Sequence, residues 1–177
     1  WWFFDGFGGD LSGTQLKSVD PDGTLARLIP AERVVWAVVN NSVSELTDGT
    51  LEHSRGMLLT LGRPTDDSAG LEDIGDVLRS AGYKCVVSQS IRQEIWSKLL
   101  ANVTLNPISA LAMAKIDEVF DEPLVRECVM AVAAEAQAVA NKLGLESSPS
   151  RIERMKDAKV KTSMLQDLER GRPLELG

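Results

Sequence analysis

The sequence predicts an α/β region followed by an all-helical region, and three observations support this fold class. Short runs rich in β-branched residues alternate with turn signals over the first half of the chain. One apolar segment with helical spacing lies between two of these runs, as in a strand–helix–strand unit. From Ser90 onward, apolar residues recur only at helical spacing. We therefore expect two domains, residues 1–89 and residues 90–177.

The first half carries the predicted strands. β-branched and alternating runs predict strands at residues 33–39, 50–53, 57–62 and 84–88. Turn chemistry is strong at residues 20–23 (Asp-Pro-Asp-Gly) and at residues 48–49 (Asp-Gly). A helix is predicted at residues 71–81, and Gly82 suits its end because glycine readily adopts a positive φ.

The second half is predicted to be helical throughout. Apolar periodicity indicates helices at residues 91–105, 107–113, 121–143, 151–161 and 162–169, with a loop or cap at residues 147–150. Pro107 is expected to end the first of these helices, because a residue before proline avoids the helical region. Asp121 is expected to cap the third, with Pro123 in its first turn and Gly144 at its end.

Composition narrows the function classes. The chain has 177 residues, 44% hydrophobic and 25% charged, which is typical of a globular protein. Its net charge of -7 argues against nucleic acid or an anionic membrane as partner. No apolar run approaches the roughly 20 residues of a membrane span. Cys85 and Cys128 are expected to be buried, reduced thiols of a cytoplasmic protein.

The sequence shows no metal site, because His53 is the only histidine and has no assigned role. The start of the chain is unusual: five of the nine aromatic residues lie within the first seven positions. An apolar cluster of that size is normally covered. We therefore expect a piece cut at both ends from a longer chain.

One polar row stands out in the second half. Lys98, Asn102 and Asn106 are four residues apart, so on a helix they share one side. At about 100° per residue, Leu99 and Val103 fall beside this row, in what we expect to be a buried stripe. A row at the border of a buried stripe can line a cleft. Spacing alone favours the alternative, in which the row is a solvated helix edge.

Two long motifs favour a functional site. Residues 94–111 (EIWSKLLANVTLNPISAL) and residues 162–175 (TSMLQDLERGRPLE) resemble the two signatures of the ketopantoate reductase (2-dehydropantoate 2-reductase) family. The aromatic residues 1–4 are similar to the segment that follows an Asn-Gly pair in these enzymes. The resemblance extends over essentially the whole chain.

The resemblance implies a fold and an activity. Residues 1–89 would be the C-terminal half of a Rossmann-type NADP-binding domain, and residues 90–177 an incomplete helical domain of the 6-phosphogluconate dehydrogenase type. The family reduces ketopantoate to (R)-pantoate with NADPH, in pantothenate and coenzyme A synthesis. Lys98 matches the general acid, while Asn102, Asn106 and Ser163 match substrate-binding positions. Glu175 matches an acidic residue that bonds the substrate hydroxyl and orients the lysine, or that binds the cofactor.

These residue types suit ketone reduction. Hydride addition to a ketone leaves negative charge on oxygen, which an ammonium group stabilises and protonates. A free lysine, with a pKa of about 10.4, carries this proton at neutral pH. Asparagine amides supply donors and acceptors without net charge.

Departures from the family keep alternatives open. A hydride cofactor requires a Gly-x-Gly-x-x-Gly turn after a strand, and the glycine-rich residues 5–10 have the wrong spacing. We therefore expect this chain alone to be inactive and not to bind NADPH. One alternative is a related reductase acting on another 2-keto or β-hydroxy acid. Another is a non-catalytic helical binding or dimerisation fragment, and a homodimer through the helical domain also stays open.

Overall fold

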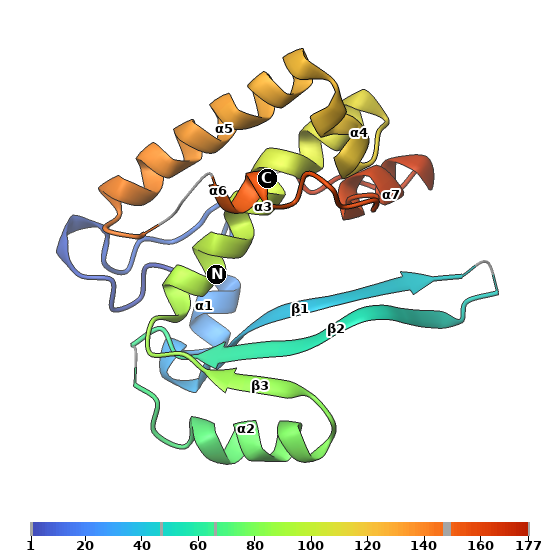
Figure 1. Ribbon diagram of the computed structural model, residues 1–177. Coiled ribbons are helices and arrows are strands. Elements are labelled where there is room, and N and C mark those ends of the chain that lie inside the picture. Colours follow the sequence, from blue (N-terminus) through green and yellow to red (C-terminus); the bar gives the residue numbers. More distant parts are fainter. Residues whose placement is uncertain (1, 47, 66, 147–149, 177) are drawn as a thin grey trace. The chain divides into compact units, whose positions relative to one another are not determined.

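The computed structural model describes residues 2–46, 48–65, 67–146 and 150–176. It divides into two compact units, Trp1–Glu94 and Ile95–Gly177. The first unit contains every strand of the described residues, and the second is helical. A part with strands and helices is thus followed by a helical part, as the sequence predicts (Figure 1).

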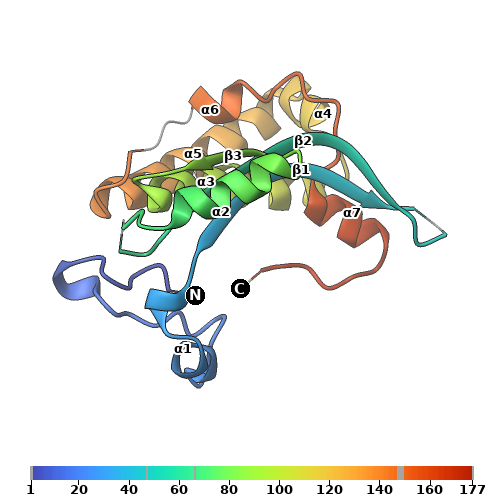
Figure 2. The same ribbon diagram turned by 90° about the horizontal axis from the view of Figure 1, so that it is seen from below.

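The sheet of the first unit has three strands in the order β1-β2-β3. Its members are β1 (Trp36–Glu45), β2 (Leu51–Gly62) and β3 (Lys84–Val87). Strands β1 and β2 pair antiparallel, and β2 and β3 pair parallel. The parallel connection runs through α2 (Leu71–Ser80), which lies over one face of the sheet (Figure 2).

The β1–β2 hairpin is longer than the sequence predicts. The two separate strands expected at residues 50–53 and 57–62 are one strand, β2. It continues because Gly56, at φ +82°, accommodates a bulge opposite Asn40 and Ser42 without breaking the pairing. The predicted Asp-Gly turn is confirmed, with Gly49 at φ +81°.

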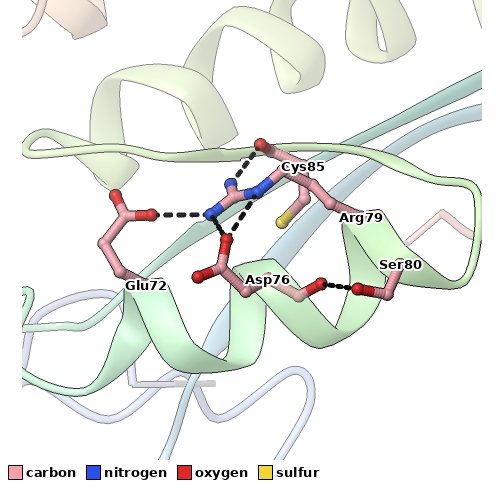
Figure 3. Close-up of polar contacts among 5 residues, drawn as sticks. All are labelled: Glu72, Asp76, Arg79, Ser80 and Cys85. Atoms are coloured by element: carbon pink, nitrogen blue, oxygen red, sulfur yellow. Dashed lines mark hydrogen bonds and ion pairs between the residues drawn. The ribbon is translucent and has the colours of Figure 1, made fainter.

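Helix α2 is held to β3 by one arginine (Figure 3). Nη2 of Arg79 lies 2.8 Å from both Glu72 and Asp76, and Nη1 donates a 2.8 Å hydrogen bond to the carbonyl of Cys85. The hydrogen bond to Asp76 contributes most, and that to Glu72 second, to a pKa of Arg79 above its usual value. A Cβ at Gly75 would lie 3.1 Å from this guanidinium, so the glycine inside the helix leaves room for it.

The aromatic residues at positions 2–4 and 7 are half-buried, and Arg92 contacts this segment within the first unit. Arg92, 7% exposed, donates hydrogen bonds to the carbonyls of Phe3 and Asp5. Its guanidinium also lies 5.5 Å from the ring centre of Phe7 and 5.6 Å from that of Trp36.

Short helices complete the first unit: the 3-10 helices Gly9–Leu11 and Ala31–Arg33, and α1 (Thr24–Leu28). The buried carboxylate of Asp20 accepts hydrogen bonds from the main-chain N–H groups of Leu25 and Ala26, both at 3.0 Å. The predicted Asp-Pro-Asp-Gly turn therefore also begins a helix, because its first carboxylate satisfies two N-terminal donors.

Helix α3 (Ile91–Ala112) corrects the prediction that Pro107 ends the motif helix. The helix continues through the proline as a single element of 22 residues. Leu105, Ile108 and Ala110 on either side of Pro107 are all at least 91% buried. Their packing offsets the roughly 3 kcal/mol that an interior proline costs a helix.

The remaining helices are α4 (Ile116–Asp121), α5 (Pro123–Lys142), α6 (Ser150–Glu153) and α7 (Ser163–Glu169). Glu122, not Asp121, is the N-cap of α5, because Pro123 forces the residue before it out of the helical region. The ends predicted at Gly82 and Gly144 are confirmed, with φ +94° and +68°.

The helix predicted at residues 151–161 is wrong beyond Glu153. The carbonyls of Ala158 and Val160 instead accept hydrogen bonds, both at 3.2 Å, from the main-chain N–H groups of Asp117 and Ile116. This segment thus supplies hydrogen-bond acceptors to the N-terminus of α4 instead of continuing α6. Most of the loop expected at residues 147–150 lies outside the described residues.

The core of the second unit joins α3, α4, α5 and α6. Its buried members are Leu100, Leu105, Ile108, Ile116, Val119, Phe120, Val129, Ala133 and Ile152. One sequence expectation fails in this unit, since Cys128 is exposed although it was expected to be buried. Both cysteines are free, as predicted.

Candidate functional site

The predicted polar row is present on α3. Lys98, Asn102 and Asn106 all lie in one uninterrupted helix, so their side chains follow one side of it. Lys98 and Asn106 are half-buried and Asn102 is exposed. The row therefore presents one ammonium and two amides along the edge of a helix whose opposite side is fixed in the core.

The buried side of α3 contains hydroxyl groups as well as apolar side chains. Thr104 is fully buried, and its Oγ1 donates a 2.7 Å hydrogen bond to the carbonyl of Leu100. Ser109, 1% exposed, donates through Oγ to the carbonyl of Ala114 at 2.6 Å. Because the main chain satisfies both hydroxyls, these residues pack in the core without an unpaired polar group.

This arrangement corrects the expected buried stripe. Leu99 and Val103 are 45% and 43% exposed, although both were expected to be buried. The prediction considered apolar side chains alone, so it placed the buried face of α3 roughly a quarter turn from where the structure has it. The difference arises because Thr104 and Ser109 occupy buried positions that apolar residues would otherwise take. The polar row thus has buried residues on one side and exposed aliphatic residues on the other.

The other two predicted site residues lie on separate segments of the second unit. Ser163 is the first residue of α7 and is exposed. The residue before it, Thr162, is the N-cap of α7, and its side-chain hydroxyl accepts a 3.2 Å hydrogen bond from the N–H of Leu165. Glu175 is exposed and follows α7 in a segment without regular secondary structure. The structure brings Lys98, Asn102 and Asn106 together, while the approach of Ser163 and Glu175 to that row stays a prediction.

A surface cavity of about 260 Å³ lies elsewhere in the second unit. Its lining is charged and consists of Phe120, Asp121, Arg126, Glu153, Lys156 and Asp157. None of the five predicted site residues lines it. Glu153, Lys156 and Asp157 come from residues 151–161, for which the sequence predicts a helix and no site.

The described residues contain no candidate metal site. They contain no group of three or more His, Cys, Asp or Glu side chains placed to hold a metal ion. Among the same residues, no helix is long and apolar enough to cross a membrane.

The C-terminal half of the chain matches a known family model. Residues 90–177 match "Ketopantoate reductase PanE/ApbA C terminal". A 2-dehydropantoate 2-reductase of Mesorhizobium japonicum is 38% identical over 99% of this chain. The chain belongs to the ketopantoate reductase PanE/ApbA family. The helical part is thus the C-terminal domain of this family, preceded by a part with a mixed sheet.

Solved structures agree with membership of the ketopantoate reductase family. A crystal structure from Ralstonia solanacearum MolK2, provisionally assigned as a ketopantoate reductase, superposes with a TM-score of 0.86 at 37% identity over 94% of this chain. The chain spans about half the length of these relatives, 56% of the Mesorhizobium protein and 53% of the Ralstonia chain.

Two further solved structures are similar to this chain at lower sequence identity. A dimeric ketopantoate reductase from Staphylococcus aureus is 26% identical, with a TM-score of 0.71 over 84% of this chain and 52% of its own. A D-mandelate dehydrogenase in complex with NADH has a TM-score of 0.77 at 19% identity, over 87% of this chain and 55% of its own. At that identity the likeness concerns the fold alone.

Proposed function

We propose that this chain forms the substrate-binding and proton-donating part of an NADPH-dependent 2-dehydropantoate 2-reductase, which reduces ketopantoate to (R)-pantoate. The observation that carries the proposal is the row of Lys98, Asn102 and Asn106 along one side of α3, in a member of the ketopantoate reductase family. In this proposal residues 1–89 belong to the NADP-binding domain and residues 90–177 to the substrate domain.

Lys98 is the proposed general acid. As the ketone carbon gains a hydride, the C=O π bond breaks and negative charge develops on oxygen. The ammonium of Lys98 stabilises that charge and transfers one proton from Nζ to the oxygen, which gives the hydroxyl of pantoate. The neutral amine then regains a proton from solvent.

The other residues bind and orient. The amides of Asn102 and Asn106 offer hydrogen bonds to the carboxylate and ketone of the acid and to the Lys98 side chain. We assign Ser163 to the substrate carboxylate and Glu175 to the orientation of Lys98, since a nearby carboxylate favours the charged form of lysine.

The described residues do not fit the pyrophosphate of NADPH. A dinucleotide turn joins a strand to a helix through Gly-x-Gly-x-x-Gly. Here the glycine-rich segment around Gly6, Gly8 and Gly9 precedes the first described strand, β1, and leads into a 3-10 helix of three residues. We therefore assign no residue of this chain to the pyrophosphate and expect the 177-residue chain to show no micromolar binding of NADPH in a fluorescence titration.

The activity is tested in the complete reading frame that encodes this chain. NADPH oxidation is followed with ketopantoate and with a panel of other 2-oxo acids. We expect ketopantoate to be preferred, and Lys98→Ala to lower kcat by about 10²–10⁴-fold. Lys142→Ala is the matched control, because Lys142 is an exposed lysine at the end of α5. Full activity of Lys98→Ala would exclude this mechanism, and a preference for another acid would identify a related reductase.

The quaternary state is a separate proposal. A homodimer through the helical domain is supported by the dimeric relative from Staphylococcus aureus. Light scattering of the complete protein tests it, and a monomer at micromolar concentration contradicts it.

A further inference from the structure

Two exposed aliphatic side chains accompany the polar row of α3. Leu99 and Val103 are 45% and 43% exposed, whereas Leu100 and Leu105 in the core of the second unit are 1% and 2% exposed. The core of the second unit therefore does not account for Leu99 and Val103.

Helix geometry places this pair directly against the amides. Leu99 and Val103 are an i, i+4 pair, and each has an asparagine three residues further on, Asn102 and Asn106. Residues three and four apart on a helix have Cβ atoms about 5–6 Å apart. An apolar row thus runs alongside the amide row, and Lys98 immediately precedes Leu99.

We propose that Leu99 and Val103 are specificity-determining residues, which contact the branched alkyl body of a 2-oxo acid whose ketone lies against Lys98. This inference rests on the proposed function. The ketone and carboxylate of such an acid match an ammonium and two amides. A fully substituted carbon next to the ketone carries methyl groups that need an apolar surface beside those polar groups, and the Leu99–Val103 pair is such a surface.

The Leu99–Val103 pair distinguishes 2-oxo acids by the size of the alkyl group next to the ketone. A branched acid covers both side chains and removes apolar surface from water, whereas an acid as short as pyruvate leaves most of that surface exposed. The polar row serves both acids equally. Leu99 and Val103 therefore affect the preference between them and leave the proton transfer unchanged.

Substrate discrimination in the complete protein tests this inference. We expect Leu99→Ser and Val103→Ser each to lower kcat/KM for ketopantoate by about 10–100-fold, mainly through KM. With pyruvate the same variants should change kcat/KM by less than about threefold, since its short body makes little apolar contact. Val139→Ser on α5 is the matched control, because that valine is 50% exposed and far along the chain from the row; it should change neither value.

The outcomes separate the two proposals. Equal losses with both acids, or no loss with either, overturn the role of the pair while the function of Lys98 stands. A lower thermal stability or a changed oligomeric state, with an unchanged ratio of the two kcat/KM values, identifies the pair as a packing surface and also overturns it. If wild-type protein reduces neither acid, the proposed function fails, and this inference fails with it.

Discussion

Nη1 of Arg79 on α2 donates a 2.8 Å hydrogen bond to the main-chain carbonyl of Cys85 on β3. The same guanidinium binds Glu72 and Asp76, so one side chain joins a helix to the strand it precedes (Figure 3). We expect Arg79→Ala to lower the melting temperature by a few degrees and to increase hydrogen exchange in β3. Circular dichroism and amide exchange measure the two effects.

Arg79→Lys is the matched control for this contact. Lysine keeps the charge but cannot direct separate N–H groups at two carboxylates and a carbonyl in fixed geometry. Faster exchange at β3 in both variants supports the hydrogen bond to Cys85 as the stabilising contact. A lysine variant identical to wild type would show that charge alone is sufficient.

Gly56 cannot be replaced without disturbing the β1–β2 hairpin. A Cβ there would lie 2.2 Å from the carbonyl oxygen of Asn40, and φ is +82°. We expect Gly56→Ala to lower the free energy of unfolding by more than about 2 kcal/mol, from backbone strain and steric overlap together. Gly49→Ala separates these causes, because Gly49 has φ +81° with nothing within 4 Å; its expected cost is about 1 kcal/mol. Equal losses in urea denaturation would contradict the overlap.

Met113 adopts a backbone conformation that glycine usually provides. It has φ +52° just after α3, and Ala114 N–H bonds to the carbonyl of Ser109 at 3.1 Å. Gly144 ends α5 in the same way, with Leu145 N–H bonded to the carbonyl of Ala140 at 2.9 Å. We expect Met113→Gly to raise the free energy of unfolding by roughly 0.5–1 kcal/mol and Gly144→Ala to lower it by about 1 kcal/mol. Urea denaturation checks both signs, and a destabilised Met113→Gly would show that the methionine side chain stabilises the fold.

Pro107 has no N–H, so the carbonyl of Val103 lacks its usual donor four residues later in α3. We expect Pro107→Ala to restore that bond and to raise the free energy of unfolding by about 1–3 kcal/mol. Pro123→Ala is the control, because Pro123 occupies the first turn of α5, where no N–H is needed, and it should change stability by less than about 1 kcal/mol. Similar shifts for the two variants in chemical denaturation would contradict this account.

The carboxyl of Asp22 makes stability depend on acidity. Thr24 lowers its pKa, first by donating from Oγ1 at 2.9 Å and second through its main-chain N–H. A lowered carboxyl pKa stabilises the folded state above the unfolded pKa, so this contribution is lost as the pH falls below about 4 and through the lowered value. We expect Thr24→Val to raise the pKa of Asp22 in an NMR titration. Asp48 is the internal control, because Thr50 lowers its pKa; a shift at Asp48 would indicate a wider change.

Local chemistry was sufficient to predict much of the fold. Positive-φ glycines at 82 and 144 end helices as expected, and the Asp-Gly turn joins two strands. The errors arose where distant packing decides the structure. Burial on both sides carries α3 through Pro107, and the carbonyls of Ala158 and Val160 serve α4 instead of a helix of their own.

The candidate site was predictable to a similar extent. Spacing correctly placed Lys98, Asn102 and Asn106 on one helix. It could not show that Leu99 and Val103 are exposed, because that depends on where Thr104 and Ser109 find main-chain acceptors. Ser163 and Glu175 lie far along the chain from this row, so periodicity has no bearing on their approach to it.

The start of α3 meets the end of β2 without an intervening side chain. A Cβ on Gly62 would lie 2.3 Å from the Cβ of Ile91, which is fully buried. Position 62 therefore cannot gain a side chain while isoleucine occupies position 91. A relative that gains a side chain at position 62 must lose bulk at position 91 in the same lineage, and these two columns of a family alignment should vary together.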